Sequence, residues 1–133
     1  YRDNFKIVPI CLMRLGIDKC EELSNAIISA VEKTGRNVLI VASSDMTHYE
    51  THENASKKDK YALDQILRLD AKGLFTTVHD KNISMCGVNP VAIMLMCARK
   101  VGAQDALLAK YMTSGEVGGN MDRVVGYAGV IVK

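Results

Sequence analysis

A carboxylic acid, an imidazole and a thiol stand in two short stretches of this chain of 133 residues. Asp45 and His48 lie three residues apart, directly after an apolar run, and Cys86 lies just before an expected helix start. Such side chains bind metals, transfer protons or attack carbonyl carbons. Both stretches lie where loops leave rigid elements, where α/β proteins usually carry their ligand sites. Asp45, His48 and Cys86 are therefore the candidate catalytic residues.

Asp45 and His48 allow two interpretations. As a functional pair they are a proton acceptor and the group that orients it, or two metal ligands. As structural residues, Asp45 caps a short turn and His48 is a solvated loop residue. The residues alone leave both interpretations open.

Cys86 allows two interpretations as well. Unpaired N–H groups and the dipole at a helix start favour negative charge on its sulfur, which suits a nucleophile or a metal ligand. Alternatively it is a small side chain packed under the helix. The adjacent Gly87 indicates a close backbone approach.

The remaining His and Cys residues carry weaker signals. His52 follows His48 by four residues, but the zinc-protease pattern needs Glu directly after the first His, so we expect His52 at the surface. His79 lies in a polar turn and is also expected at the surface. Cys11 and Cys97 lie in apolar segments and are expected in the core.

The elements expected around these residues begin with a strand–helix–strand unit. Residues 6–12 and 37–42 are apolar runs that predict two buried strands. Between them the apolar residues recur at helical spacing, with Asp18 at the start and Gly35 at the end. Such a unit favours two parallel strands joined by a right-handed crossover.

The second half of the chain predicts further helices and two strands. The expected elements are a helix over about 57–69 capped by Ser56, a short helix over 70–80, a buried helix opened by Asn89 and Pro90, and strands over Ala106–Thr113 and Val124–Val132. The fold class expected is α/β, with a mostly parallel or mixed sheet and helices on both faces. Residues 1–133 are expected to form a single domain.

Composition excludes several functional classes. Charged residues make up 24% of the chain, the net charge is +2, and acidic and basic residues are interspersed along the chain. No basic stripe for nucleic acid is therefore expected. No apolar run reaches the roughly 20 residues that span a bilayer, so no membrane is expected. The four cysteines form no CxxC pair, and reduced thiols in a cytoplasmic protein are expected. The first residue is Tyr1 and not Met, which predicts a trimmed chain.

Three motifs together resemble those of a known family. Ser43-Ser44-Asp45-x-x-His48, then Cys86-Gly87-x-x-Pro90, then Tyr127-Ala128-Gly129 resemble the carboxy-terminal half of Memo-like proteins. The resemblance extends from about residue 5 to residue 132. That family is similar in fold to the extradiol ring-cleaving dioxygenases, which use non-haem iron. The resemblance therefore implies a dioxygenase-like three-layer architecture, of which this chain would be a part.

The resemblance also implies roles for the three candidate residues. His48 matches an acid/base position, Cys86 matches the place of a third metal ligand, and Asp45 lies beside them in the cleft. The implied metal is iron or copper, held with two further His ligands from the amino-terminal half of the domain. No His precedes His48 in this chain. Met46-Thr47 and Tyr49 depart from the family, which often has an aromatic residue and Cys before the His and Trp after it.

Three functions are consistent with these observations. The first is a metal-dependent redox or dioxygenase-like site, with His48 and Cys86 as ligands and Asp45 and His48 handling protons. The second is a non-enzymatic module that binds a peptide or protein in the same cleft. The third is a Cys–His hydrolase with Cys86 as nucleophile. The missing amino-terminal half is the expected partner, and the surface it would cover predicts self-association of this chain.

Overall fold

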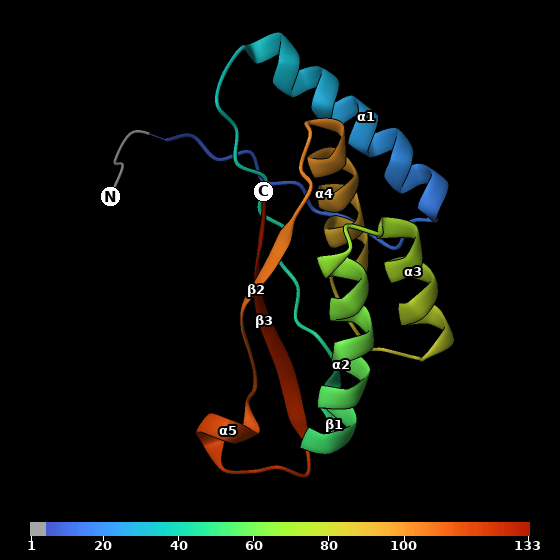
Figure 1. Cartoon of the computed structure of the whole chain (residues 1–133), viewed down its shortest axis with the longest axis vertical. Coiled ribbons are helices and arrows are strands. Elements are labelled where there is room, and N and C mark those ends of the chain that lie inside the picture. The colour runs from blue at the N-terminus through green and yellow to red at the C-terminus, as the bar shows by residue number, and fades with distance from the viewer. Residues whose placement is uncertain (1–4) are drawn as a thin grey trace.

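A computed structural model of the chain describes residues 5–133, which form an α/β protein with five helices and three strands. The elements are α1 (Ile17–Thr34), β1 (His48–Glu50), α2 (His52–Leu67), α3 (Ala71–Asp80), α4 (Val88–Lys100), β2 (Ala106–Thr113), α5 (Gly115–Gly118) and β3 (Val124–Val132) (Figure 1). The predicted fold class is therefore confirmed at the level of α/β. Tyr1, on which the expectation of a trimmed chain rests, lies outside the described residues.

The sheet is antiparallel, so the predicted parallel or mixed sheet is wrong. Its strand order is β1-β3-β2, and β3 pairs antiparallel with both neighbours. The predicted bounds of β2 and β3 are confirmed. A short connection over 114–123 joins these two strands, and a connection of that length returns the chain antiparallel, whereas a parallel pair needs a longer crossover.

Two predicted strands, at residues 6–12 and 37–42, are not strands in the structure. Both segments are extended, yet neither enters the sheet, and most of their apolar side chains are exposed: Val8 is 81% exposed and Leu39 is 86% exposed. Leu12, Ile40 and Ala42 are the apolar side chains of these segments that pack partly against the core. Cys11, expected in the core, is exposed. A strand forms only when a neighbouring strand satisfies its backbone groups, and within the described residues no strand pairs with these segments. The predicted strand–helix–strand unit is therefore wrong.

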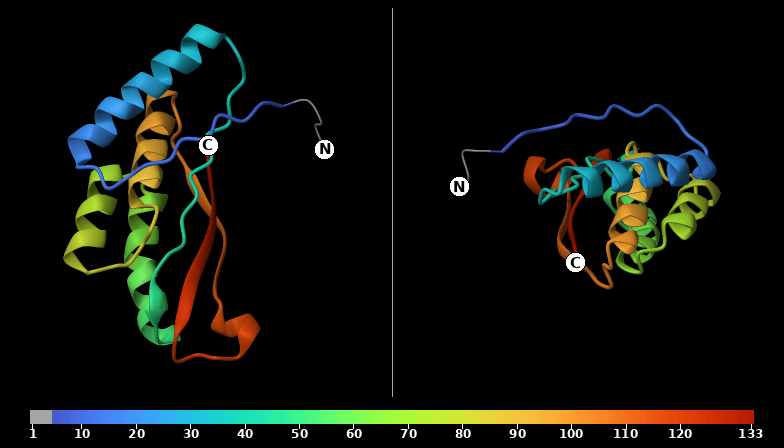
Figure 2. Two further views of the ribbon diagram at one scale, coloured as in Figure 1. Left: turned by 180° about the vertical axis from the view of Figure 1, so that it is seen from behind. Right: turned by 90° about the horizontal axis from the view of Figure 1, so that it is seen from above.

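The helices α1 to α4 lie together on one side of the long strands β2 and β3 (Figures 1 and 2). Helix α2 packs directly on both strands, and α3 packs on α2. The expectation of helices on both faces is not met within residues 5–133, because the second face carries no helical layer there.

Two helices start earlier than predicted. Helix α2 begins at His52, where the Thr51 side chain accepts a hydrogen bond from the Asn54 N–H, so Thr51 and not Ser56 is the cap. Its first turn is polar and shows no apolar periodicity, so the sequence pattern does not predict a helix there. Helix α4 begins at Val88, and Asn89 lies in its first turn instead of capping it. The predicted stop of α1 at Gly35 is confirmed, with a left-handed φ of 58°.

Helix α4 is the centre of the core, as its apolar sequence predicts. It packs between α1 and α3, and Ala92, Leu95 and Cys97 are fully buried. Asn89 joins it to α1 and to the residues just before α1, because its side-chain N–H groups donate to Cys20 Sγ at 3.2 Å and to the Leu15 carbonyl at 2.9 Å. None of the helices within residues 5–133 is long and apolar enough to cross a membrane.

Replacing Leu95 with Ala tests the central role of α4. The substitution leaves a cavity in the core, and we expect the free energy of unfolding to fall by about 2–5 kcal/mol in urea titration. The matched control is Leu107→Ala on β2, where the side chain is 56% exposed and the expected loss is below about 1 kcal/mol. Equal losses in the two variants would contradict the assignment.

Candidate functional site

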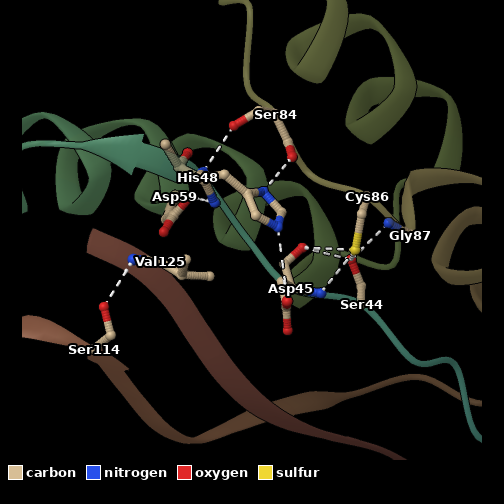
Figure 3. A network of polar contacts seen from close by, with 10 residues as sticks. Ser44, Asp45, His48, Asp59, Ser84, Cys86, Gly87, Ser114 and Val125 are labelled. Carbon is tan, nitrogen blue, oxygen red and sulfur yellow. Dashed lines mark hydrogen bonds and ion pairs between the residues drawn. The ribbon is translucent and has the colours of Figure 1, made fainter. Parts of the chain in front are cut away.

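Asp45, His48 and Cys86 come together in the structure, as the sequence predicts. Asp45 and His48 lie at the entry to β1, and Cys86 lies in the loop between α3 and α4 (Figure 3). His48 Nε2 lies 3.7 Å from Asp45 Oδ2, and one donor atom from each residue lies within 4.8 Å of the others. All three side chains reach solvent, so a ligand can approach them.

Ser84 fixes the orientation and the tautomer of His48. The His48 backbone N–H donates to Ser84 Oγ at 2.7 Å, and ring Nδ1 lies 2.7 Å from the Ser84 carbonyl oxygen. Because a carbonyl oxygen only accepts, Nδ1 carries the proton. The lone pair of the neutral ring is then on Nε2, which faces Asp45 (Figure 3). Such a nitrogen can accept a proton or bind a metal.

Cys86 is held against the backbone of Asp45. The Asp45 N–H donates to Cys86 Sγ at 3.2 Å, which stabilises negative charge on the sulfur. The Gly87 N–H donates to Ser44 Oγ at 2.9 Å, and a Cβ on Gly87 would lie only 2.5 Å from the Ser43 carbonyl oxygen. The close backbone approach expected at Gly87 is therefore confirmed, and it joins the two motifs.

Tyr49 distorts the strand that carries His48. Its φ is 61°, in the left-handed region that a residue with a side chain rarely adopts, and the pairing of β1 with β3 is irregular between His48 and Glu50. The Tyr49 ring is exposed, lies beside the His48 ring and carries the Arg123 guanidinium 4.8 Å from its centre. Backbone strain of this kind is typical of functional sites.

Asp59 contributes to the site, although sequence patterns alone assign it no role there. It is fully buried on α2, where Oδ1 accepts from the Thr47 N–H and Oδ2 accepts from the Tyr111 hydroxyl, both at 2.8 Å. Ala55, Ala62, Leu63 and Ile66 surround it at helical spacing and are buried. An acid on the apolar face of a helix is the signal that could have identified it.

The remaining His and Cys residues lie elsewhere. The sequence predicts His52 at the surface, but it is half-buried. Its Nδ1 contacts the buried Thr113 hydroxyl at 2.8 Å. His79 is exposed, as predicted, beside Asp80. Cys97 is buried, as predicted, and burial raises the pKa of its thiol while Lys100 opposes that rise. None of these side chains belongs to the donor group of Asp45, His48 and Cys86.

An open groove runs up to Cys86 from the other side. Its volume is about 560 Å³, and its lining includes Met13, Phe75, Val78 and Met85. Asp45 and His48 do not line it. Polar side chains, among them Arg14 and Asn82, also line the groove. Cys86 therefore lines a groove of mixed character and also contacts the Asp45 backbone.

The described residues thus form an α/β protein with an accessible group of carboxylate, imidazole and thiol side chains, which are residue types that can bind a metal or transfer a proton. The family model described as Memo-like protein matches residues 1–131. This chain belongs to the Memo-like family, as its motifs predict.

Relatives of the chain come from several archaea. It is 38% identical over all its 133 residues to a MEMO1 family protein of Methanopyrus kandleri, covering 47% of that relative. It is 42% identical over 130 residues to one of Methanosarcina acetivorans, covering 49%, and 43% identical over 130 residues to one of Methanocaldococcus jannaschii, covering 45%. The chain thus spans about half the length of the curated relatives it matches.

Thiol labelling tests the placement of the four cysteines. We expect iodoacetamide to modify the exposed Cys11 and Cys86 in the folded protein, and Cys20 and Cys97 only after unfolding. The raised pKa of Cys97 acts in the same direction, because it keeps the thiol protonated. Mass spectrometry of peptides over time gives each rate, with the protein in urea as the reference. Modification of Cys20 or Cys97 at the rate of Cys11 would contradict this placement.

Proposed function

We propose that Asp45, His48 and Cys86 form part of a metal-dependent redox centre of the dioxygenase-like kind. The observation that carries the proposal is the convergence of three donor atoms within 4.8 Å, with the unprotonated nitrogen of His48 directed into the group. The family membership of the chain supports it, because the resemblance to Memo-like proteins implies ligand and acid/base roles for these same positions.

The donor set fits iron or copper. Thiolate and imidazole are ligands that both metals accept. Donor atoms bound at about 2.0–2.3 Å to one tetrahedral ion lie roughly 3.3–3.8 Å apart. Small movements of the accessible side chains would bring the three donors from within 4.8 Å to that spacing.

In this proposal each side chain has a separate task. Cys86 Sγ and His48 Nε2 would hold the ion, which when bound would supply redox chemistry. Asp45 Oδ2, beside Nε2, can accept a proton from a molecule bound in the site. The Asp45 side chain is 47% exposed, so it can pass that proton to water. Ser84 keeps Nδ1 protonated and Nε2 available.

The groove beside Cys86 favours a second candidate function. Its lining, which combines apolar side chains with polar ones, would suit a peptide or protein segment in a module that performs no reaction. Binding of a ligand that survives both His48→Ala and metal removal would favour this function over the redox centre. The hydrolase hypothesis has less support, because the hydrogen-bond partners of Cys86 Sγ within residues 5–133 are Asp45 and Ser44, and His48 is not among them.

Two ligands from this chain leave the coordination of the ion incomplete, and an apolar surface beside the site suggests where the rest comes from. We name residues 6–12 and 37–42 the extended segments. Both are apolar, extended and largely exposed. The relatives are about twice as long as this chain. We propose that the extended segments pair with the portion of the domain that the relatives carry outside the match, and that this portion supplies further ligands.

Metal titration tests the redox centre. We expect the protein to bind Fe(II), and Co(II) as a spectroscopic substitute with a thiolate charge-transfer band. Cys86→Ser should remove the band, and His48→Ala should weaken binding by roughly 10- to 100-fold or more. Cys11→Ser is the matched control, because that exposed thiol lies outside the donor group. Unchanged stoichiometry in Cys86→Ser would sink the ligand role.

Hydrogen exchange tests the extended segments. Their amides should exchange freely in the chain alone, and should become protected when it is co-expressed with the unmatched portion of the Methanosarcina acetivorans relative. Amides in the β2–β3 pair serve as the internal control, because they are already hydrogen-bonded. Light scattering that shows a stable dimer, with the segments protected in the chain alone, would make a second copy the occupant and overturn this proposal.

A further inference from the structure

The Asp59 carboxylate is fully buried beneath the short segment that joins Asp45 to His48. Burying a charge is costly unless other groups compensate it. No ion pair among residues 5–133 includes Asp59, so hydrogen bonds supply its compensation. They come from two other elements: the Thr47 N–H, just before β1, and the Tyr111 hydroxyl on β2.

Tyr111 is suited to remain the donor in this network. Burial raises the pKa of Tyr111, and the neighbouring Asp59 carboxylate raises it further, against an opposing contact with Ser56. The phenol therefore stays protonated well into the alkaline range. Asp59 Oδ2 therefore keeps a neutral donor. Without the Tyr111 hydroxyl, this buried carboxylate oxygen would have to reach water or remain without a hydrogen bond.

Hydrogen bonds hold the backbone on both sides of Thr47. The Met46 N–H donates to the Gly126 carbonyl and the Gly126 N–H donates to the Thr47 carbonyl, both at 2.9 Å. Gly126 on β3 carries no side chain because Asp59 Oδ2 fills the space where a Cβ would stand. Helix α2 and strand β3 thus hold all three peptide groups between Asp45 and His48, one hydrogen bond to each.

Each end of this fixed segment makes one of the contacts that bring the site together. At one end the Asp45 N–H reaches Cys86 Sγ, and at the other the His48 N–H reaches Ser84 Oγ (Figure 3). A shift of the segment would change both contacts together. We infer that Asp59, with Tyr111, is a positioning residue that holds Asp45 and His48 in register with Cys86.

The contact acts on the backbone of Thr47 and not on its side chain. Thr47 Oγ1 is buried and has no hydrogen-bond partner among the described residues. Thr47→Val therefore removes nothing that holds the segment, and it is the matched control at the same place. Only the Co(II)-binding readout rests on the proposed metal centre. The alkylation rate of Cys86 measures the position of Asp45 relative to Cys86 without any metal.

The experiment compares Asp59→Ala, Asp59→Asn and Tyr111→Phe with Thr47→Val, all in a Cys11→Ser background. Loss of the register removes the Asp45 N–H from Cys86 Sγ. We expect Asp59→Ala and Tyr111→Phe to slow alkylation of Cys86 by roughly two- to tenfold, the effect of one lost hydrogen bond. Co(II) binding should weaken by roughly 10- to 100-fold. Asp59→Asn keeps an oxygen for the Thr47 N–H and should recover part of both losses, and Thr47→Val should match wild type.

Stability is controlled separately. Ile28→Ala removes a buried side chain on α1, which packs against α4 away from the site, and gives a variant with lowered stability but an intact register. If Ile28→Ala slows alkylation as much as Tyr111→Phe does, or if the Asp59 and Tyr111 variants all alkylate like wild type, the inference is overturned. If Asp59→Ala does not fold, Tyr111→Phe and Asp59→Asn still decide it. Absence of Co(II) binding in wild type would refute the metal centre, while the alkylation rates would still decide the positioning role.

Discussion

The buried Asp59 carboxylate is the interaction on which the rest of the site depends. It compensates its own burial with donors from β2 and from the chain before β1, and so joins helix α2 to the sheet through charge-assisted hydrogen bonds. Gly126 on β3 leaves room for it. An apolar side chain at this position would pack but could not accept a hydrogen bond from the Thr47 N–H. Burial of the carboxylate costs desolvation free energy, and in return its hydrogen bonds hold the backbone in one position.

The site is built from backbone contacts as much as from side chains. Ser84 accepts from both the backbone and the ring of His48, and the Asp45 N–H holds Cys86 Sγ. These contacts place a proton acceptor, an unprotonated imidazole nitrogen and a thiol in one accessible group. The strained φ at Tyr49 adds to this picture, because strain is stable only where the surrounding structure fixes it.

The extended segments explain why the sheet differs from the one expected. Residues 6–12 and 37–42 have the apolar composition of buried strands, and the pattern predicts strands for that reason. Sheet pairing is a property of two segments, and within residues 5–133 neither segment has a neighbour to pair with. The same absence leaves Cys11 and Leu39 exposed. Composition thus predicts a buried environment that the fold of residues 5–133 does not form around most of these side chains.

Motif spacing and apolar periodicity are local properties, so the family, the buried helix α4, the strands β2 and β3 and the close approach at Gly87 could be predicted from the residues alone. The antiparallel order of the sheet and the tautomer of His48 could not, because each depends on a partner distant in the chain. Asp59 is the clearest case: its sequence neighbours predict a helix, but its role comes from Thr47 and Tyr111, which only folding brings to its two oxygens.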